Sequence, residues 1–167
     1  MANLASNPWT VLPADVVVSS PTALSVNTDG SVNLTTTAPF AGATVGIGVT
    51  LINNTPTAYN GFYRILQVTS PTVFVLTPYN NIPLTTGVGT IFGTAAKNLY
   101  NAHIRVRWMN WENSTVGNIL ELRDRNGNLV WKATSTVTGE QKFTKLAWIF
   151  GLTPIAMPTG EVFVTVG

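Results

Sequence analysis

The chain has 167 residues, which is enough for one sizeable hydrophobic core or for two smaller ones. Charged side chains make up only 10% of it, against about 25% in an ordinary soluble domain, and the formal net charge is +2. A surface so poor in charge is tolerated where neighbouring proteins cover much of it; the alternative is a Thr-rich β protein whose exposed strand faces use hydroxyls. The sequence contains no cysteine, which excludes disulfides, thiol nucleophiles and Cys-ligated metal sites.

Residues 1–14 have no apolar period and contain two prolines, which predicts an extended N-terminal arm. They hold no basic side chain and no long apolar core, so we do not expect a secretory signal. Trp9 stands between the two prolines. It either packs into the protein's own core or docks on a neighbouring subunit, because an indole exposed on a free tail is costly. Our hypothesis is that the arm docks on a neighbour and that its deletion leaves the rest folded.

Short apolar runs alternate with turn signals over the next 80 residues or so. β-branched and aromatic residues are dense here, and no window sustains the 3.6-residue apolar period of a helix. The predicted strand segments are 15–20, 23–37 around an Asp29-Gly30 turn, 43–52, 62–68 and 73–79. We therefore predict an all-β fold made of antiparallel sandwich-like or barrel-like modules.

Charge is spread unevenly along the chain. Residues 1–96 carry three charged side chains, and residues 97–167 carry the other thirteen. This asymmetry predicts a β module at 15–95 and a second at 96–167, joined near 93–98. One continuous β-sandwich is the alternative.

The clearest alternating strand is AHIRVRWM, residues 102–109. Alternation places Ala102, Ile104, Val106 and Trp108 on a core face, with His103, Arg105, Arg107 and Met109 opposite. Arg105 and Arg107 could join Lys132, Lys142 and Lys145 in a basic stripe, which would be a solvated sheet face or a docking surface for an acidic protein. Nucleic acid is disfavoured because +2 is a small net charge for tracking phosphates. Trp111 would face outward, which makes it the preferred surface anchor.

The stretch LRDRNGNLVW, residues 122–131, alternates Asp124, Asn126 and Asn128 like the start of a calcium loop. The twelfth position of such a loop would be Ser135 and not the required Glu, so we reject calcium. A two-residue Asn126-Gly127 turn instead predicts that Leu122 faces Trp131, Glu121 faces Lys132 and Arg125 faces Asn128. The apolar face would hold Leu120, Leu122, Leu129, Trp131 and Ala133, and Val130 does not fit this pattern.

No residue pattern indicates catalysis. His103 is the sole histidine, no nucleophile elbow accompanies it, and the seven carboxylates form no recognisable pair. We predict a protein that is not an enzyme and needs no cofactor or metal. The tryptophans Trp108, Trp111, Trp131 and Trp148 leave a carbohydrate-binding module as a further alternative.

Two segments resemble bacteriophage virion proteins. ATVGIGVTLINNTPTAYNGFYRILQVTSPTVFVLTP, residues 43–78, is similar to a small β module with a Tyr-Asn-Gly turn that is frequent in phage structural proteins. GNILELRDRNGNLVWKAT, with the later WIFGL and GEVFVTVG in residues 117–167, resembles the C-terminal β module of small phage proteins encoded among head and tail genes.

The resemblance implies a virion structural protein that is assembled in the host bacterial cytoplasm. We expect a capsid decoration or cement protein that forms a homo-oligomer and binds the major capsid protein or other virion proteins. A tail or neck component, as an adaptor or fibre module, is the alternative. The residues of this chain that we expect to contact partners are Trp9, Arg105, Arg107 and Trp111. We expect no membrane partner, since the most apolar run near the C-terminus, 146–152, is too short to span a bilayer.

Overall fold

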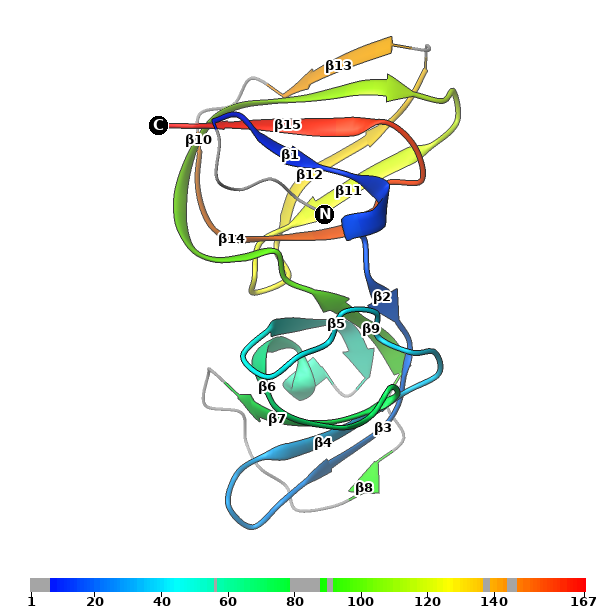
Figure 1. Cartoon of the computed structure of the whole chain (residues 1–167), viewed down its shortest axis with the longest axis vertical. Helices are drawn as coiled ribbons and strands as arrows, with labels where there is room; N and C mark the ends of the chain where they lie inside the picture. The colour runs from blue at the N-terminus through cyan, green and yellow to red at the C-terminus, as the bar shows by residue number, and fades with distance from the viewer. Residues whose placement is uncertain (1–6, 56, 79–87, 90–91, 137–138, 144–146) are drawn as a thin grey trace. The chain divides into compact units, whose positions relative to one another are not determined.

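The computed structural model describes residues 7–55, 57–78, 88–89, 92–136, 139–143 and 147–167. The chain is all-β, with antiparallel sheets, one of which is nearly closed into a barrel-like form (Figure 1). It divides into two compact units. Unit 1 contains the described residues up to Val16, Leu99–Asp124 and Asn128 onward, and unit 2 contains Val17–Asn98 with Arg125–Gly127.

Unit 1 holds a sheet of seven strands among the described residues, in the order β1-β15-β10-β14-β11-β12, with β13 paired to β10. These strands are β1 (Trp9–Val11), β10 (Tyr100–Ser114), β11 (Ile119–Arg123), β12 (Leu129–Thr134), β13 (Gly139–Phe143), β14 (Ala147–Ala156) and β15 (Glu161–Val166). A short 3-10 helix, η1 (Pro13–Asp15), follows β1. Their inward side chains form one hydrophobic core, which includes Val106, Leu120, Leu152 and Val162.

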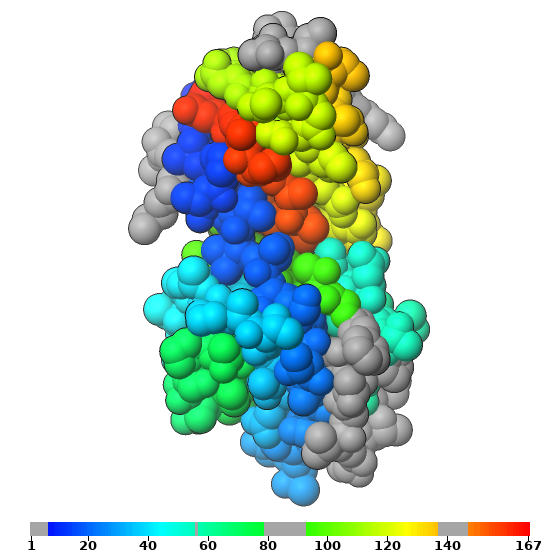
Figure 2. Space-filling model, turned by 90° about the vertical axis from the view of Figure 1, so that its right-hand side faces the viewer, coloured from blue at the N-terminus to red at the C-terminus, as the bar shows by residue number. Residues whose placement is uncertain are grey.

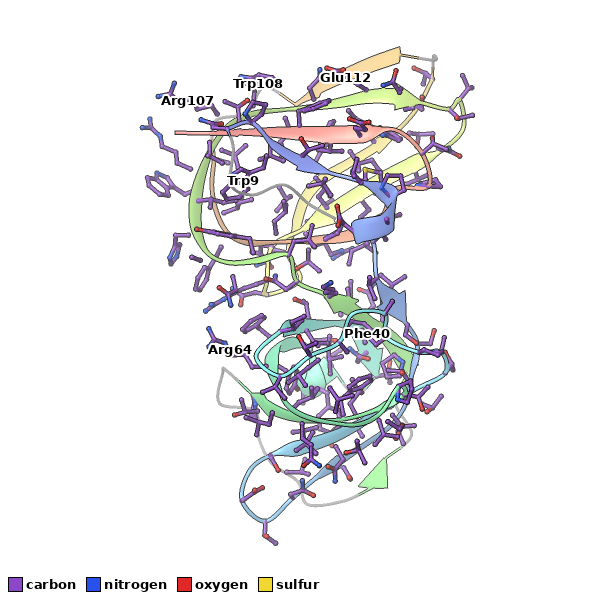
Figure 3. All side chains as sticks on the ribbon, viewed as in Figure 1. Trp9, Phe40, Arg64, Arg107, Trp108 and Glu112 are labelled. Atoms are coloured by element: carbon purple, nitrogen blue, oxygen red, sulfur yellow. The ribbon has the colours of Figure 1, made fainter. Side chains whose placement is uncertain are left out.

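The N-terminal strand β1 pairs with β15, so segments from opposite ends of the sequence lie side by side (Figures 1 and 2). Trp9 lies opposite Val164, and its side chain is 7% exposed. The ring centroid of Trp9 is 4.8 Å from that of Tyr100, and the indole points into unit 1 (Figure 3). Trp9 therefore belongs to the core of its own unit. The hypothesis that it docks on a neighbouring subunit is wrong, because its partner strand is supplied about 150 residues later in the same chain.

The long strand β10 changes its buried side halfway along. Ile104 and Val106 face the core as predicted, but the register shifts between Val106 and Trp108, where a bulge inserts one extra residue. Beyond the bulge Met109 and Trp111 turn inward and are fully buried. Trp108 is instead 41% exposed. The predictions of a buried Trp108 and an outward Trp111 are wrong because a bulge reverses the alternation.

The hairpin between β11 and β12 confirms two of the three predicted pairs. Leu122 faces Trp131 and Glu121 faces Lys132, but Arg123 faces Leu129, which leaves Val130 as the extra residue of a bulge. Val130 packs partly against the core, and Leu129 is turned outward with 55% of its side chain exposed. The predicted apolar face is therefore correct except at Leu129.

The turn of this hairpin is one residue longer than predicted. Asp124 N–H donates to the Asn128 carbonyl oxygen at 2.9 Å, so Asp124 rather than Arg125 faces Asn128. The loop is Arg125–Gly127, and Gly127 has a φ of 89°, a conformation that favours glycine.

Unit 2 holds eight strands among the described residues, in the order β2-β9-β5-β6-β7-β4-β3-β8. They are β2 (Val18–Ser19), β3 (Pro21–Val26), β4 (Val32–Thr36), β5 (Gly48–Thr55), β6 (Gly61–Ser70), β7 (Val73–Pro78), β8 (Val88–Gly89) and β9 (Phe92–Lys97). A 3-10 turn, η2 (Thr57–Tyr59), precedes β6. Strands are present in each predicted segment between 15 and 79, but the first is reduced to Val18–Ser19, and β5 begins at Gly48 rather than at residue 43.

The core of unit 2 is built from aliphatic and aromatic side chains of most of its strands, including Leu34, Leu51, Tyr63 and Phe74. Residues Arg125–Gly127 belong to the same unit: the Arg125 carbonyl oxygen accepts a hydrogen bond from Thr50 Oγ1 at 3.0 Å, and the Arg125 Cζ atom lies 5.0 Å from the Phe62 ring centroid. The boundary between Asn98 and Leu99 lies within a few residues of the predicted module boundary at 95/96.

Candidate functional site

Two arginines project from the outer side of β10. Arg105 and Arg107 are exposed, because Ile104 and Val106 between them face the core. Neither makes an ion pair within the described part of the chain. Figure 3 shows Arg107 reaching outward, with Trp108 beside it on the outer side of the strand. We call Arg105, Arg107 and Trp108 the basic strand face.

The three lysines of the predicted stripe do not extend this face in the described structure. Lys132 Nζ lies 3.1 Å from Glu121 Oε2, so its charge is paired within the hairpin. The side chain of Lys142 and the whole of Lys145 lie outside the described residues. The positive charge that the structure places here is therefore that of Arg105 and Arg107.

Aromatic side chains continue the same surface onto β14, the strand next to β10. His103 is the register partner of Phe150, and Arg105 is the partner of Trp148. The rings of His103 and Phe150 stack, with centroids 3.9 Å apart and planes at 3°. Ile149 faces the core, so Trp148 points outward, and 70% of its side chain is exposed. Trp148 is a flat aromatic group held on a strand and open to a ligand or partner.

A cavity of about 470 Å³ opens beside Trp148, and we call it the Trp148 cleft. Its wall includes His103, Asp124, Leu129, Val130, Trp148 and Phe150. The bulge at Val130 contributes to this wall, because it turns Leu129 away from the core. All of these residues belong to unit 1.

Asp124 is held firmly at the edge of the cleft. Asn128 donates to it twice, from its backbone N–H to Oδ1 at 2.8 Å and from Nδ2 to Oδ2 at 2.8 Å. These two bonds fix the orientation of the carboxylate. These hydrogen bonds close the hairpin turn.

The groups of this surface can donate hydrogen bonds, accept them and stack. The surface offers two guanidinium donors, a stacked imidazole, a carboxylate acceptor and an open indole ring, all on or beside adjacent strands. Within the described residues, no group of three or more His, Asp or Glu side chains is arranged to hold a metal ion. No helix among those residues has the length and apolar character needed to cross a membrane.

The structure separates the four predicted contact residues into two pairs. Arg105 and Arg107 are on the surface, whereas Trp9 and Trp111 are in the core of unit 1. Trp111 Nε1 donates to the Thr159 carbonyl oxygen at 3.0 Å, which satisfies the buried indole N–H. The prediction of Trp111 as a surface anchor is therefore wrong.

Sequence reasoning named Trp148 only as one of four tryptophans that could bind carbohydrate, and it did not name Phe150. Alternation about a buried Ile149 would have placed both aromatic residues on the opposite face. The bulge that exposes Leu129 does leave a mark in the sequence, because Val130 is the one apolar residue that does not fit the alternation.

Comparisons of the chain with protein-family models, with curated proteins and with solved structures found no match.

Proposed function

We propose that this chain is a structural protein of a bacteriophage virion that decorates the major capsid shell and acts by binding rather than by catalysis. The virion context of the proposal comes from the resemblance of residues 43–78 and 117–167 to phage structural modules. The all-β fold in two compact units agrees with that proposal. So does a surface with few charges, which suits a protein largely covered by neighbours.

The observation that carries the proposal is the basic strand face. Arg105 and Arg107 are exposed on one strand and unpaired within the described chain, with the partly exposed Trp108 beside them. Arginine and tryptophan are enriched among the residues that dominate protein–protein binding energy. An acidic patch on a partner would pair with both guanidinium groups, while Trp108 would lose its remaining contact with water.

In this proposal the mechanism is mechanical. Each copy would bury the basic strand face against an acidic surface of the shell, and homo-oligomers would bridge neighbouring capsomers. Every joint adds buried area that must be separated before the shell can rupture, so the barrier to rupture rises with occupancy. The pressure of packaged DNA is the load that such joints would resist.

A tail or neck component is the alternative within the same class. The basic strand face would serve there as well, so the surface by itself does not choose between the two positions. Decoration predicts binding over the whole shell, whereas a tail or neck protein would bind at a single vertex.

The test is binding of the purified protein to undecorated shells of the phage that encodes it. We expect Arg105→Glu to weaken binding at least about tenfold, the scale of one lost charge-assisted contact plus one new repulsion. Arg64→Glu is the matched control, because it makes the same change of charge at an exposed arginine in unit 2 (Figure 3). Equal binding by the two variants would contradict the role of the basic strand face.

A further inference from the structure

We propose that the Trp148 cleft is a binding site for neutral carbohydrate. The cleft adjoins the basic strand face, since Arg105 is the register partner of Trp148, but Arg105, Arg107 and Trp108 are not among the residues that line it. The inference does not depend on the proposed virion role, because it requires only the geometry of unit 1.

The size of the cleft fits a small ligand. Its volume of about 470 Å³ lies within the range of roughly 300–1,000 Å³ that is usual for small-molecule sites. Its walls combine apolar side chains with few polar groups, which is the usual composition of such sites. One or two sugar rings fit a space of this size.

Trp148 supplies the surface on which a sugar ring would stack. A pyranose presents a flat patch of C–H groups on one face, and these groups pack against the electron-rich face of an indole. Trp148 is 70% exposed, although burying an indole would be strongly favourable, so the ring has apolar surface still to be covered. Its strand β14 is paired with β10 at this point, which fixes the backbone that carries it.

The polar groups of the cleft suit sugar hydroxyls. Asp124 places a carboxylate in the wall, and two hydrogen bonds from Asn128 hold it in position. The imidazole of His103 is held parallel to the Phe150 ring, so its nitrogen atoms lie at a fixed ring edge where one can donate and the other accept. Groups held in place by their neighbours lose little entropy when they bind a ligand.

The charge of the cleft argues against nucleic acid and other anions. Asp124 is a carboxylate in the wall, and no lysine or arginine lines the site among the described residues. Phosphate binding requires cationic or N–H donors, and a carboxylate at the site repels phosphate. A neutral glycan does not need a cationic partner and is not repelled by the carboxylate.

The experiment uses the full chain and three neutral trisaccharides as probes: cellotriose, maltotriose and tri-N-acetylchitotriose. Binding is measured by calorimetry and by tryptophan emission. Three of the five tryptophans, Trp9, Trp111 and Trp131, are buried, so a sugar that covers Trp148 changes the emission of one of the two exposed indoles. We expect at least one trisaccharide to bind and to protect that emission from quenching by acrylamide.

Trp148→Ala removes the stacking surface without touching the core, and we expect it to weaken binding by about tenfold or more. Trp148→Phe keeps a flat ring and should recover part of the affinity. Trp108→Ala is the matched control, because Trp108 is the other exposed indole of unit 1 and lies outside the cleft. Trp108→Ala should bind the trisaccharides as the wild type does.

Three results would overturn the proposal. These are the absence of binding by all three trisaccharides, equal binding by wild type and Trp148→Ala, and binding only of a ten-nucleotide oligothymidine in a salt-dependent manner. The last result would assign the cleft to single-stranded nucleic acid. Loss of shell binding in Arg105→Glu with sugar binding unchanged would leave both proposals standing, since they use different residues.

Discussion

Arg123 donates a hydrogen bond from Nε to Glu121 Oε1 at 2.7 Å, and this contact holds a largely buried carboxylate on the β11–β12 hairpin. The second carboxylate oxygen, Oε2, lies 3.1 Å from Lys132 Nζ on the facing strand. Burial raises the pKa of Glu121, but the hydrogen bonds from Arg123 and Lys132 outweigh it, so the pKa lies below its usual value. Glu121 is thus a charged link across the hairpin.

This arrangement predicts how stability depends on pH. The pKa of Glu121 is lower in the folded state than in the unfolded one, so its contribution to the free energy of unfolding is complete above about pH 4.3 and is lost as the pH falls through the folded pKa. We expect Glu121→Gln to reduce the acid-induced fall in melting temperature between neutral pH and pH 3. Glu161→Gln, at a glutamate with no ion pair within the described residues, is the control. An acid response of Glu121→Gln that matches the wild type would show that the link does not contribute.

Gly127 is a position in the hairpin turn at which an added side chain should destabilise the fold. Its φ of 89° disfavours a β-branched residue, and a Cβ atom there would meet the side chain of Ile52. We expect Gly127→Val to lower the free energy of unfolding by about 1–3 kcal/mol, the cost of a strained backbone position. Urea denaturation measures this change. A urea midpoint equal to that of the wild type would contradict the turn assignment.

Trp9 makes the N-terminal segment part of the fold. Its side chain is buried in unit 1 against Tyr100, so Trp9→Ala should cost about 3–5 kcal/mol, as large-to-small changes in a core do. For the same reason, deletion of residues 1–14 should lower the melting temperature markedly. Trp108→Ala, at a partly exposed indole of the same unit, should cost far less. Similar losses for Trp9→Ala and Trp108→Ala would contradict the placement of Trp9.

Trp111 tests the register of β10 beyond its bulge. The indole is fully buried, and its Nε1 donates to the Thr159 carbonyl oxygen at 3.0 Å. Trp111→Phe should therefore lose packing and leave that carbonyl without its donor, at a cost of about 1–3 kcal/mol. Calorimetric melting measures the loss. A change within error would mean that Trp111 faces solvent, as simple alternation along the strand predicts.

Sequence patterns predicted the fold class and most of the pairing within one hairpin, because alternation and turn residues are local signals. Leu122 opposite Trp131 and Glu121 opposite Lys132 followed from one Asn-Gly turn. The exact turn length did not follow, because the bulge at Val130 absorbs one residue and lengthens the loop. Strand pairing next to a turn is thus more predictable than the turn itself.

The candidate site was harder to predict because it depends on irregularities and on distant pairing. The bulge after Val106 reverses which side of β10 is buried, and no residue in that stretch marks it. Trp9 pairs with a strand at the other end of the chain, and local sequence holds no sign of that partner. Trp148 reaches the surface beside His103 and Arg105 only because β14 pairs with β10 in one particular register.

The most direct test of the proposed function is the copy number of this protein in purified virions, measured by quantitative mass spectrometry against the major capsid protein. A decoration protein bound across a symmetric shell should be present in a fixed ratio to the capsid protein, and in the same ratio in tailless heads. Absence of the protein from purified virions would contradict a structural role. A few copies that depart with the tail would contradict decoration and favour the tail or neck alternative.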